Sequence, residues 1–90
     1  MKQQTAHVQV YSVEWCPFCI DARALLDQVG IEYELTDLTD HPDRRNVTAK
    51  ILAGHRTAPL IVIDDEPIGG FTELAALHAA GELATRVFCA

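Results

Sequence analysis

Long hydrophobic runs and a surplus of positive charge are both missing from this 90-residue sequence. No stretch approaches the roughly 20 apolar residues that a membrane-spanning helix needs, and the first residues lack the apolar segment of a secretory signal. Seven Lys and Arg residues stand against 13 Asp and Glu residues, which gives a formal net charge of -6. Because nucleic-acid affinity depends on clustered cations, we expect no nucleic-acid partner. Because long apolar segments are missing, we also expect no membrane association and a cytoplasmic location.

Cysteine is also scarce, and its placement argues against a disulfide-stabilised secreted domain. The three cysteines are an odd number, and two of them, Cys16 and Cys19, are only three positions apart. This spacing is typical of redox and metal sites. A structural zinc site needs four ligands, and only Cys89 and four scattered histidines remain. We therefore expect redox chemistry and no bound metal, with zinc binding or two inert buried cysteines as the alternatives.

The remaining composition is that of an ordinary globular protein. Hydrophobic residues make up 49% of the chain and charged residues 22%, which is enough apolar material to form a core. A length of 90 residues suits one core and leaves no room for a second. We expect residues 1–90 to form a single domain.

The pattern of apolar residues predicts alternating strands and helices. Residues 7–13 and 31–36 have the composition of strands. Residues 22–29 between them show helical spacing of apolar side chains and end at Gly30. A second helix is predicted after residues 40–43, where Asp40 or Asp43 supplies a cap and Pro42 an early proline, and it ends at Gly54.

The residue pattern in the second half of the chain predicts a hairpin followed by a third helix. Residues 60–63 form an apolar run suited to a central strand, residues 64–67 a turn, and Ile68 the centre of a short strand. A third helix follows Gly69 and Gly70, and a short helix or tail covers residues 83–87. The order β-α-β-α-β-β-α predicts an α/β fold: a four-stranded mixed sheet with helices on both faces and its first two strands parallel.

Cys16 lies where the first strand meets the first helix, and Pro17 suits the first position of that helix. Cys16 is therefore an N-cap candidate. The positive end of the helix favours the thiolate form of its side chain, which is the nucleophilic form. Cys19 follows one helical turn later, at a spacing of about 5–6 Å that approaches the span of a disulfide. The pair predicts reversible disulfide chemistry.

Three motifs in this order resemble those of the glutaredoxins, a family of the thioredoxin-like superfamily. They are Cys-Pro-Phe-Cys at positions 16–19, Thr-Ala-Pro at 57–59 and Gly-Gly at 69–70, and the similarity runs from about Val8 to Val87. The resemblance implies a thioredoxin-like fold and a thiol–disulfide oxidoreductase in which Cys16 attacks and Cys19 resolves. It also implies glutathione as reducing co-substrate without a tightly bound cofactor, glutathionylated or disulfide-containing proteins as partners, and a monomer.

The resemblance further implies a glutathione site. The bond before Pro59 would be cis, which leaves the backbone of Ala58 free to pair with the cysteinyl unit. The start of the third helix would receive the γ-glutamyl carboxylate, and Arg56 would face the glycyl carboxylate. The implied substrate-binding residues are Phe18, Arg56, Thr57, Ala58, Pro59, Gly70, Phe71, Thr72 and Glu73. From the residues alone, Thr72 is equally an ordinary N-cap and Arg56 an ordinary surface charge.

Three positions depart from the family pattern. Val13 stands where members usually have Lys, Glu73 replaces a common Asp, and Trp15 is more typical of thioredoxins. Trp15 and the missing Lys leave reduction by a thioredoxin reductase as one alternative. The resemblance leaves a second, an iron–sulfur cluster held between two chains by the first cysteine and glutathione, which Pro17 disfavours. Cys89 is expected to be an inert thiol, with glutathionylation or an intermolecular disulfide as its alternatives.

Overall fold

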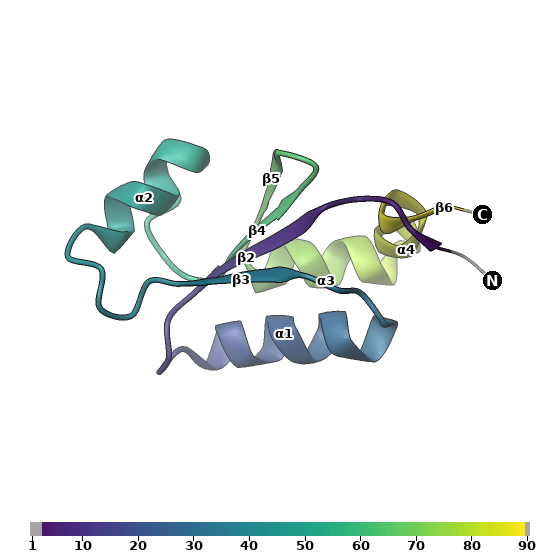
Figure 1. Ribbon diagram of the computed structural model, residues 1–90, viewed down its shortest axis with the longest axis horizontal. Coiled ribbons are helices and arrows are strands. Elements are labelled where there is room, and N and C mark those ends of the chain that lie inside the picture. Colours follow the sequence, from purple (N-terminus) through teal and green to yellow (C-terminus); the bar gives the residue numbers. More distant parts are fainter. Residues whose placement is uncertain (1–2, 90) are drawn as a thin grey trace.

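The sheet follows the predicted alternation of strands and helices. The computed structural model of the protein describes residues 3–89. Its main sheet has the strand order β3-β2-β4-β5, formed by Glu34–Asp37, Val8–Ser12, Leu60–Ile63 and Glu66–Gly69. Strands β2 and β3 are parallel, whereas β4 pairs antiparallel with both β2 and β5. The expected mixed sheet, with a parallel crossover and a closing hairpin, is confirmed (Figure 1).

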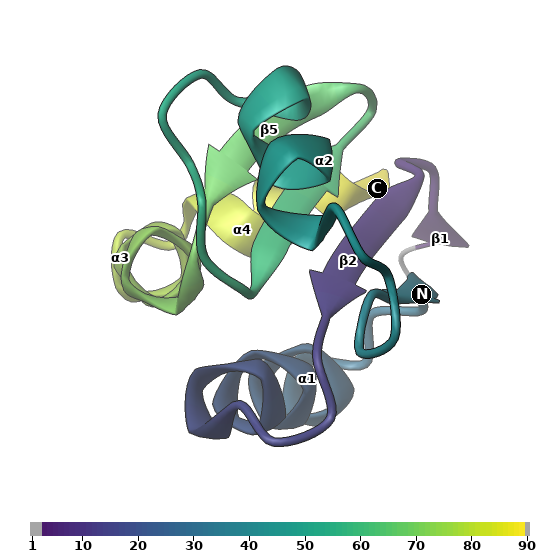
Figure 2. The ribbon, with the colours of Figure 1, turned by 90° about the vertical axis from the view of Figure 1, so that its left-hand side faces the viewer.

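Helices cover both faces of this sheet. Helix α1 (Pro17–Val29) forms the crossover between β2 and β3 and packs on one face together with α3 (Phe71–Ala79) and the short α4 (Glu82–Val87). Helix α2 (Arg44–Ile51) lies apart from α1 and α3, on the other face (Figure 2). This arrangement is a thioredoxin-like α/β fold. Within residues 3–89, no helix is long and apolar enough to cross a membrane.

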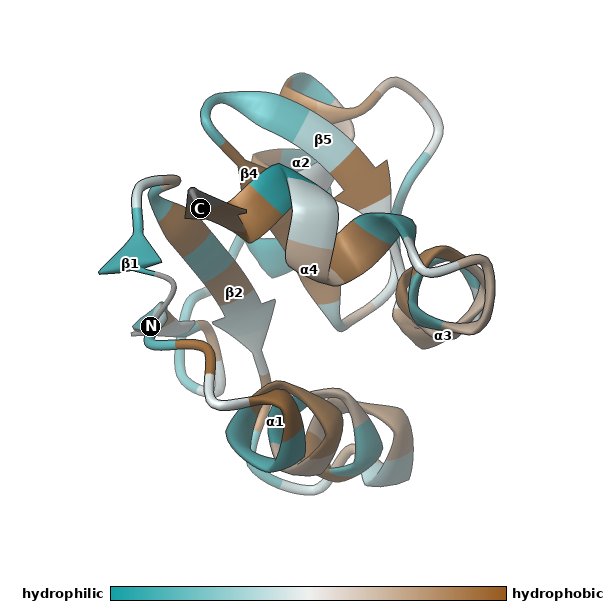
Figure 3. Cartoon of the chain, turned by 90° about the vertical axis from the view of Figure 1, so that its right-hand side faces the viewer, coloured by the Kyte–Doolittle hydropathy of each residue, from teal (hydrophilic) through white to brown (hydrophobic). Residues whose placement is uncertain are grey.

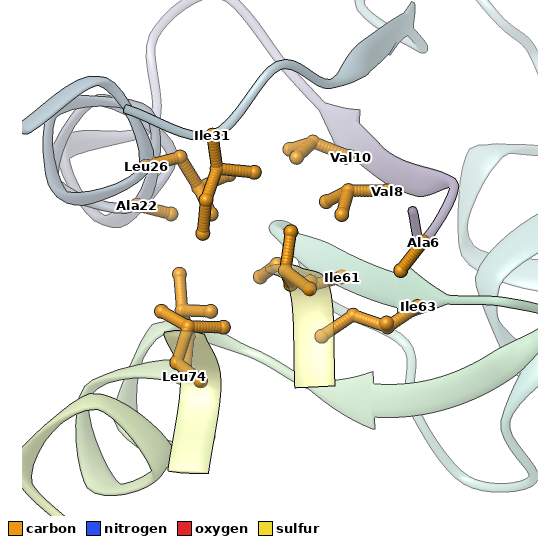
Figure 4. Packing of buried hydrophobic residues seen from close by; sticks show 11 residues of the cluster. Ala6, Val8, Val10, Ala22, Leu26, Ile31, Ile61, Ile63 and Leu74 are labelled. Carbon is orange, nitrogen blue, oxygen red and sulfur yellow. The ribbon is translucent and has the colours of Figure 1, made fainter. Parts of the chain in front are cut away.

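The main core lies between the two central strands and the helices α1, α3 and α4. Because side chains alternate along a strand, every second residue of β2 and β4 points to this side, and hydrophobic segments accordingly alternate with hydrophilic ones along β2 (Figure 3). The largest cluster of buried side chains is shown in Figure 4 and consists of Ala6, Val8, Val10, Ala22, Leu26, Ile31, Ile61, Ile63, Leu74, Leu83 and Val87.

The predicted strand over residues 31–36 begins three residues later than expected, at Glu34. Gly30 closes α1 in the left-handed conformation, and the N–H of Ile31 still bonds to the Leu26 carbonyl at 2.9 Å. The Gln4 side chain then bonds to both the N–H and the C=O of Glu32, at 2.7 and 2.6 Å. Residues 31–33 therefore complete the helix end and hold the N-terminal segment, and only afterwards does the chain join the sheet.

The second helix and the chain ends also differ from the sequence-based expectation. Pro42 lies outside α2, which starts at Arg44 after Asp43, and the Asp43 carboxylate accepts from the Asn46 amide at 2.6 Å instead of capping a backbone N–H. A two-stranded antiparallel sheet of β1 (Gln3–Gln4) and β6 (Phe88–Cys89) was not predicted. Segments of two residues carry no periodic signal. The side chain of Cys89 lies outside the described part of the structure.

Replacing a buried leucine and an exposed leucine by alanine should have very different effects on the free energy of unfolding. Leu26 is completely buried, so Leu26→Ala should lower the free energy of unfolding by about 2–5 kcal/mol. Leu35 on β3 is 42% exposed, so Leu35→Ala should change it by less than about 0.5 kcal/mol. Urea denaturation followed by circular dichroism measures both values. Equal losses would contradict the assignment of the core.

Candidate active site

The Cys16 sulfur lies at the start of α1, between two backbone groups. Cys16 is the N-cap of the helix, with extended φ and ψ of -90° and 113°, and Pro17 occupies the first turn as predicted. The backbone N–H of Cys19 donates to Cys16 Sγ at 3.3 Å. On the other side, the Cys16 thiol donates to the carbonyl oxygen of Ala58 at 3.4 Å. The cap thus uses a sulfur as the acceptor that Ser or Asp usually supplies.

Cys19 is the buried partner of this pair. Both cysteines are free thiols, but Cys19 is only 1% exposed and packs against Val13 and Leu38. Burial raises the pKa of the Cys19 thiol; a hydrogen bond with the Val13 backbone works against this rise, and the Cys16 side chain adds to it. At neutral pH Cys19 is therefore the protonated, shielded member of the pair, whereas Cys16 is half-exposed.

The loop before β4 presents Ala58 to Cys16. The bond between Ala58 and Pro59 is cis, as the resemblance implied, and Pro59 is buried. His55 Nε2 lies 3.0 Å from the Pro59 carbonyl oxygen and so donates a hydrogen bond to it. Sequence reasoning treated His55 only as a scattered histidine. Its position four residues before the proline was the signal that could have indicated a supporting role for this loop.

One groove brings together eight of the nine predicted substrate-binding residues. This groove, which we call the Phe18–Phe71 groove, has a volume of about 180 Å³. The Phe18 and Phe71 rings stack at its side, with centroids 6.4 Å apart and planes 26° apart. Its lining is Phe18, His55, Thr57, Ala58, Pro59, Gly70, Phe71, Thr72 and Glu73. The start of α1, the loop before β4 and the start of α3 therefore form one surface beside Cys16.

Helix α3 begins two residues earlier than it would if Thr72 were its N-cap. Gly70 is the N-cap and Thr72 the second residue of the helix, so that alternative is wrong. The Gly70 N–H donates to Glu73 Oε1 at 2.8 Å, which is the backward half of a capping box. Gly69 makes room for this contact: its φ is +125°, and a Cβ there would lie 2.6 Å from Glu73 Oε1. The first position of the glycine pair, Gly69, thus requires glycine for conformation and for space.

Arg56, the ninth predicted residue, faces a different hollow. It is exposed and donates to Asn46 Oδ1 at 3.3 Å. Two adjoining pockets, of about 180 and 470 Å³, share Arg44, Arg45 and Arg56 in their walls. We call them together the arginine hollow. The smaller pocket also reaches Thr57 and Ala58, so the arginine hollow and the Phe18–Phe71 groove meet at Ala58.

Val13 shows how this chain departs from the family pattern at the position that usually holds Lys. The Val13 side chain is 8% exposed and packs with Cys19 and Leu38, next to the arginine hollow that it helps to line. Cations from α2 and the following loop therefore stand around the hollow that a lysine at position 13 would enter. Sequence reasoning missed Arg44 and Arg45, because their distance to the active-site motif depends on the tertiary fold.

No group of three or more His, Cys, Asp or Glu side chains lies close enough to hold a metal ion among the residues that the structure describes. The chemistry that the site does support is thiol chemistry. One sulfur is accessible at a helix start, a second lies one turn later, and a groove that includes Ala58 adjoins the first.

Known proteins share this combination of fold and site. The glutaredoxin family model matches residues 8–68. A probable glutaredoxin of Synechocystis is 37% identical over 79 residues, covering 88% of this chain and 90% of that protein. Glutaredoxin 3 of Escherichia coli is 37% identical over 78 residues, covering 87% and 93%.

Solved structures agree with this result. The solution structure of glutaredoxin from Brucella melitensis has a TM-score of 0.82 at 30% identity, covering 94% of this chain and 91% of that chain. The crystal structure of a buckwheat glutaredoxin–glutathione complex also has a TM-score of 0.82, at 26% identity, covering 91% of this chain and 76% of that chain. The fold and the cysteine pair define a thiol–disulfide oxidoreductase of the thioredoxin-like superfamily. Within it, the chain belongs to the glutaredoxin family.

The difference between the two active-site thiols should appear in their alkylation. In a Cys89→Ser background, iodoacetamide near neutral pH should modify Cys16 and leave Cys19 unmodified, because Cys19 is buried and its pKa is raised. Since a raised pKa keeps the thiol protonated, modification of Cys19 should begin only at more alkaline pH than for an ordinary cysteine. Peptide mapping by mass spectrometry measures both sites, and urea-unfolded protein is the control. Equal rates in the folded protein would refute this assignment.

Proposed function

We propose that this glutaredoxin reduces protein–glutathione mixed disulfides and protein disulfides at Cys16, with glutathione as the electron donor. The observation that carries the proposal is the 3.4 Å contact between Cys16 Sγ and the Ala58 carbonyl, at the edge of the Phe18–Phe71 groove. A disulfide that reaches Cys16 there brings its own backbone alongside Ala58. The buckwheat relative, solved in complex with glutathione, supports this choice of ligand.

The groove offers one feature for each part of glutathione. The cysteinyl unit pairs with the Ala58 backbone as an added strand would. The γ-glutamyl carboxylate is received by the N–H groups of Phe71 and Thr72 at the start of α3. The Gly70 N–H is already bonded to Glu73 Oε1, so Gly70 contributes close backbone approach and not a free donor.

Side chains of opposite charge face the two ends of the tripeptide. Glu73 lines the groove and uses Oε1 for the Gly70 N–H, which leaves its second oxygen for the γ-glutamyl ammonium group. Arg56 lies on the opposite side of Ala58 and supplies a cation for the glycyl carboxylate. Phe18 and Phe71 form the apolar wall beside the disulfide. The peptide direction in the groove therefore runs from α3 towards Arg56.

Ionisation of Cys16 and substrate pairing are linked through Ala58. In the thiol form, the S–H group of Cys16 occupies the Ala58 carbonyl. A thiolate cannot donate, so loss of the proton frees that carbonyl for the N–H of the substrate cysteinyl unit. The Cys19 N–H continues to donate to the sulfur and stabilises its negative charge. The nucleophile and its binding partner thus become available in the same step.

The reaction is thiol–disulfide exchange. The Cys16 thiolate attacks the glutathione sulfur of a mixed disulfide, a new S–S bond forms as the old one breaks, and the protein substrate leaves as a thiolate that takes up a proton. A second glutathione, as thiolate, attacks the adduct, releasing oxidised glutathione and the Cys16 thiolate. With a protein disulfide, the Cys16 thiolate first attacks one substrate sulfur, and the other sulfur leaves as a thiolate that takes up a proton. Cys19 then loses its proton and displaces the substrate from Cys16. The resulting Cys16–Cys19 disulfide is reduced by two glutathione molecules.

Removal of the second sulfur should separate these two routes. Cys19→Ser should retain reduction of a glutathionylated peptide and lose reduction of a protein disulfide, because only the second route requires a resolving thiol. Oxidation of NADPH through glutathione reductase measures both activities. Cys16→Ser is the control and should lose both. Loss of both activities in a folded Cys19→Ser protein would contradict this division of labour.

A further inference from the structure

Positive charge is concentrated in one short part of this acidic chain. Residues 44–56 contain four of the seven Lys and Arg residues and none of the 13 Asp and Glu residues. The remaining residues therefore carry three cations against all 13 carboxylates. A field of this kind attracts an acidic partner to one face and repels it from the others.

The arginine hollow collects three of these cations next to the reactive sulfur. Arg44, Arg45 and Arg56 line it, and Ala58, whose carbonyl contacts Cys16, stands at its inner edge. Within residues 3–89 the ion pairs join His7 to Glu34 and Arg86 to Glu66, and none involves these arginines. No carboxylate of the described chain forms an ion pair with them. Asp43 also lines the larger pocket, but its carboxylate is bonded to the Asn46 amide.

Trp15 connects the hollow to the rim of the active site. It directly precedes Cys16 in the sequence and is 61% exposed. The Arg44 guanidinium lies over its ring, 5.6 Å from the centroid. This cation–π contact orients Arg44 without cancelling its charge, because the partly negative face of the indole ring attracts the cation while the ring carries no net charge. The result is a cationic wall with an apolar neighbour, which fits an acidic polypeptide segment.

We propose that the arginine hollow binds acidic residues located one to three positions after the attacked cysteine of a protein disulfide. This inference rests on the proposed function, which orients glutathione from α3 towards Arg56. A polypeptide whose cysteine pairs with Ala58 in the same direction extends its following residues into the hollow. At about 3.3 Å per extended residue, the first three positions span about 10 Å. Residues before the cysteine extend towards Glu73 instead, so acidic side chains there should not strengthen binding.

Symmetric disulfide dimers of a short peptide test this directional preference. Three peptides with one central cysteine are compared: two Glu after the cysteine, two Glu before it, and Gln in all four positions. Because the two sulfurs of each dimer are equivalent, Cys16 attacks either one, one peptide leaves as a protonated thiol, and Cys19 displaces the other. The measured quantity is kcat/KM with glutathione, glutathione reductase and NADPH.

The peptide with Glu after its cysteine should react with a kcat/KM about fivefold above that of the Gln peptide, which corresponds to two exposed ion pairs. The peptide with Glu before its cysteine should show no gain. The double variant Arg44→Gln/Arg45→Gln should abolish the gain and keep the rate on the Gln peptide. Lys50→Gln, on the same helix but outside the hollow, is the matched control and should retain it. High salt should shrink the gain.

The outcomes distinguish this inference from the proposed function. Activity on the Gln peptide and on hydroxyethyl disulfide reports the proposed function alone, and its absence would remove the basis of both. Normal activity with equal kcat/KM for all three peptides overturns only the role of the arginine hollow. Equal gains from Glu before and after the cysteine, or a gain that survives in the double arginine variant, also overturn it.

Discussion

The sulfur of Cys16 is held between backbone groups from two distant parts of the chain. The Cys19 N–H belongs to the first turn of α1, and the Ala58 carbonyl belongs to the loop before β4. Both positions are fixed by the sheet, because α1 follows β2 and the loop leads into β4, the neighbour of β2. Pairing of two adjacent central strands therefore places the nucleophile against the Ala58 backbone, which we propose pairs with the substrate. The core beneath α1 and α3 keeps this geometry rigid.

Charge divides the surface around this sulfur into two regions that meet at Ala58. The Phe18–Phe71 groove ends at Glu73 and the start of α3, whereas the arginine hollow contains three cations and no acidic side chain except that of Asp43. The Asp43 carboxylate is itself bonded to the Asn46 amide. Val13 adds no cation of its own, yet the hollow that it lines is positive. In the proposed function, position along the groove, and not the net charge of the chain, sets the charge that each end of a substrate meets.

Strong local patterns made much of this architecture predictable. The Cys-Pro start of α1, the apolar run of β4 and the glycine pair before α3 each carry a local signal, and each element formed near its expected place. The predictions failed where contacts between residues distant in sequence determine the structure. Gln4 holds Glu32 outside β3, and the β1–β6 pair joins the two ends of the described chain. The arginine hollow was equally inaccessible, because it requires knowing that α2 packs beside Ala58.

The pairing of substrate with the Ala58 backbone is the central claim, and amide hydrogen exchange tests it directly. The Cys19→Ser variant joined to one glutathione at Cys16 holds the complex in place, and its NMR spectrum reports on each backbone N–H. Our account predicts that the Ala58 N–H exchanges more slowly in the adduct than in the free variant, and that the Phe71 and Thr72 resonances shift with it. Unchanged exchange at Ala58, in an adduct whose attachment to Cys16 is verified by mass spectrometry, would contradict the account.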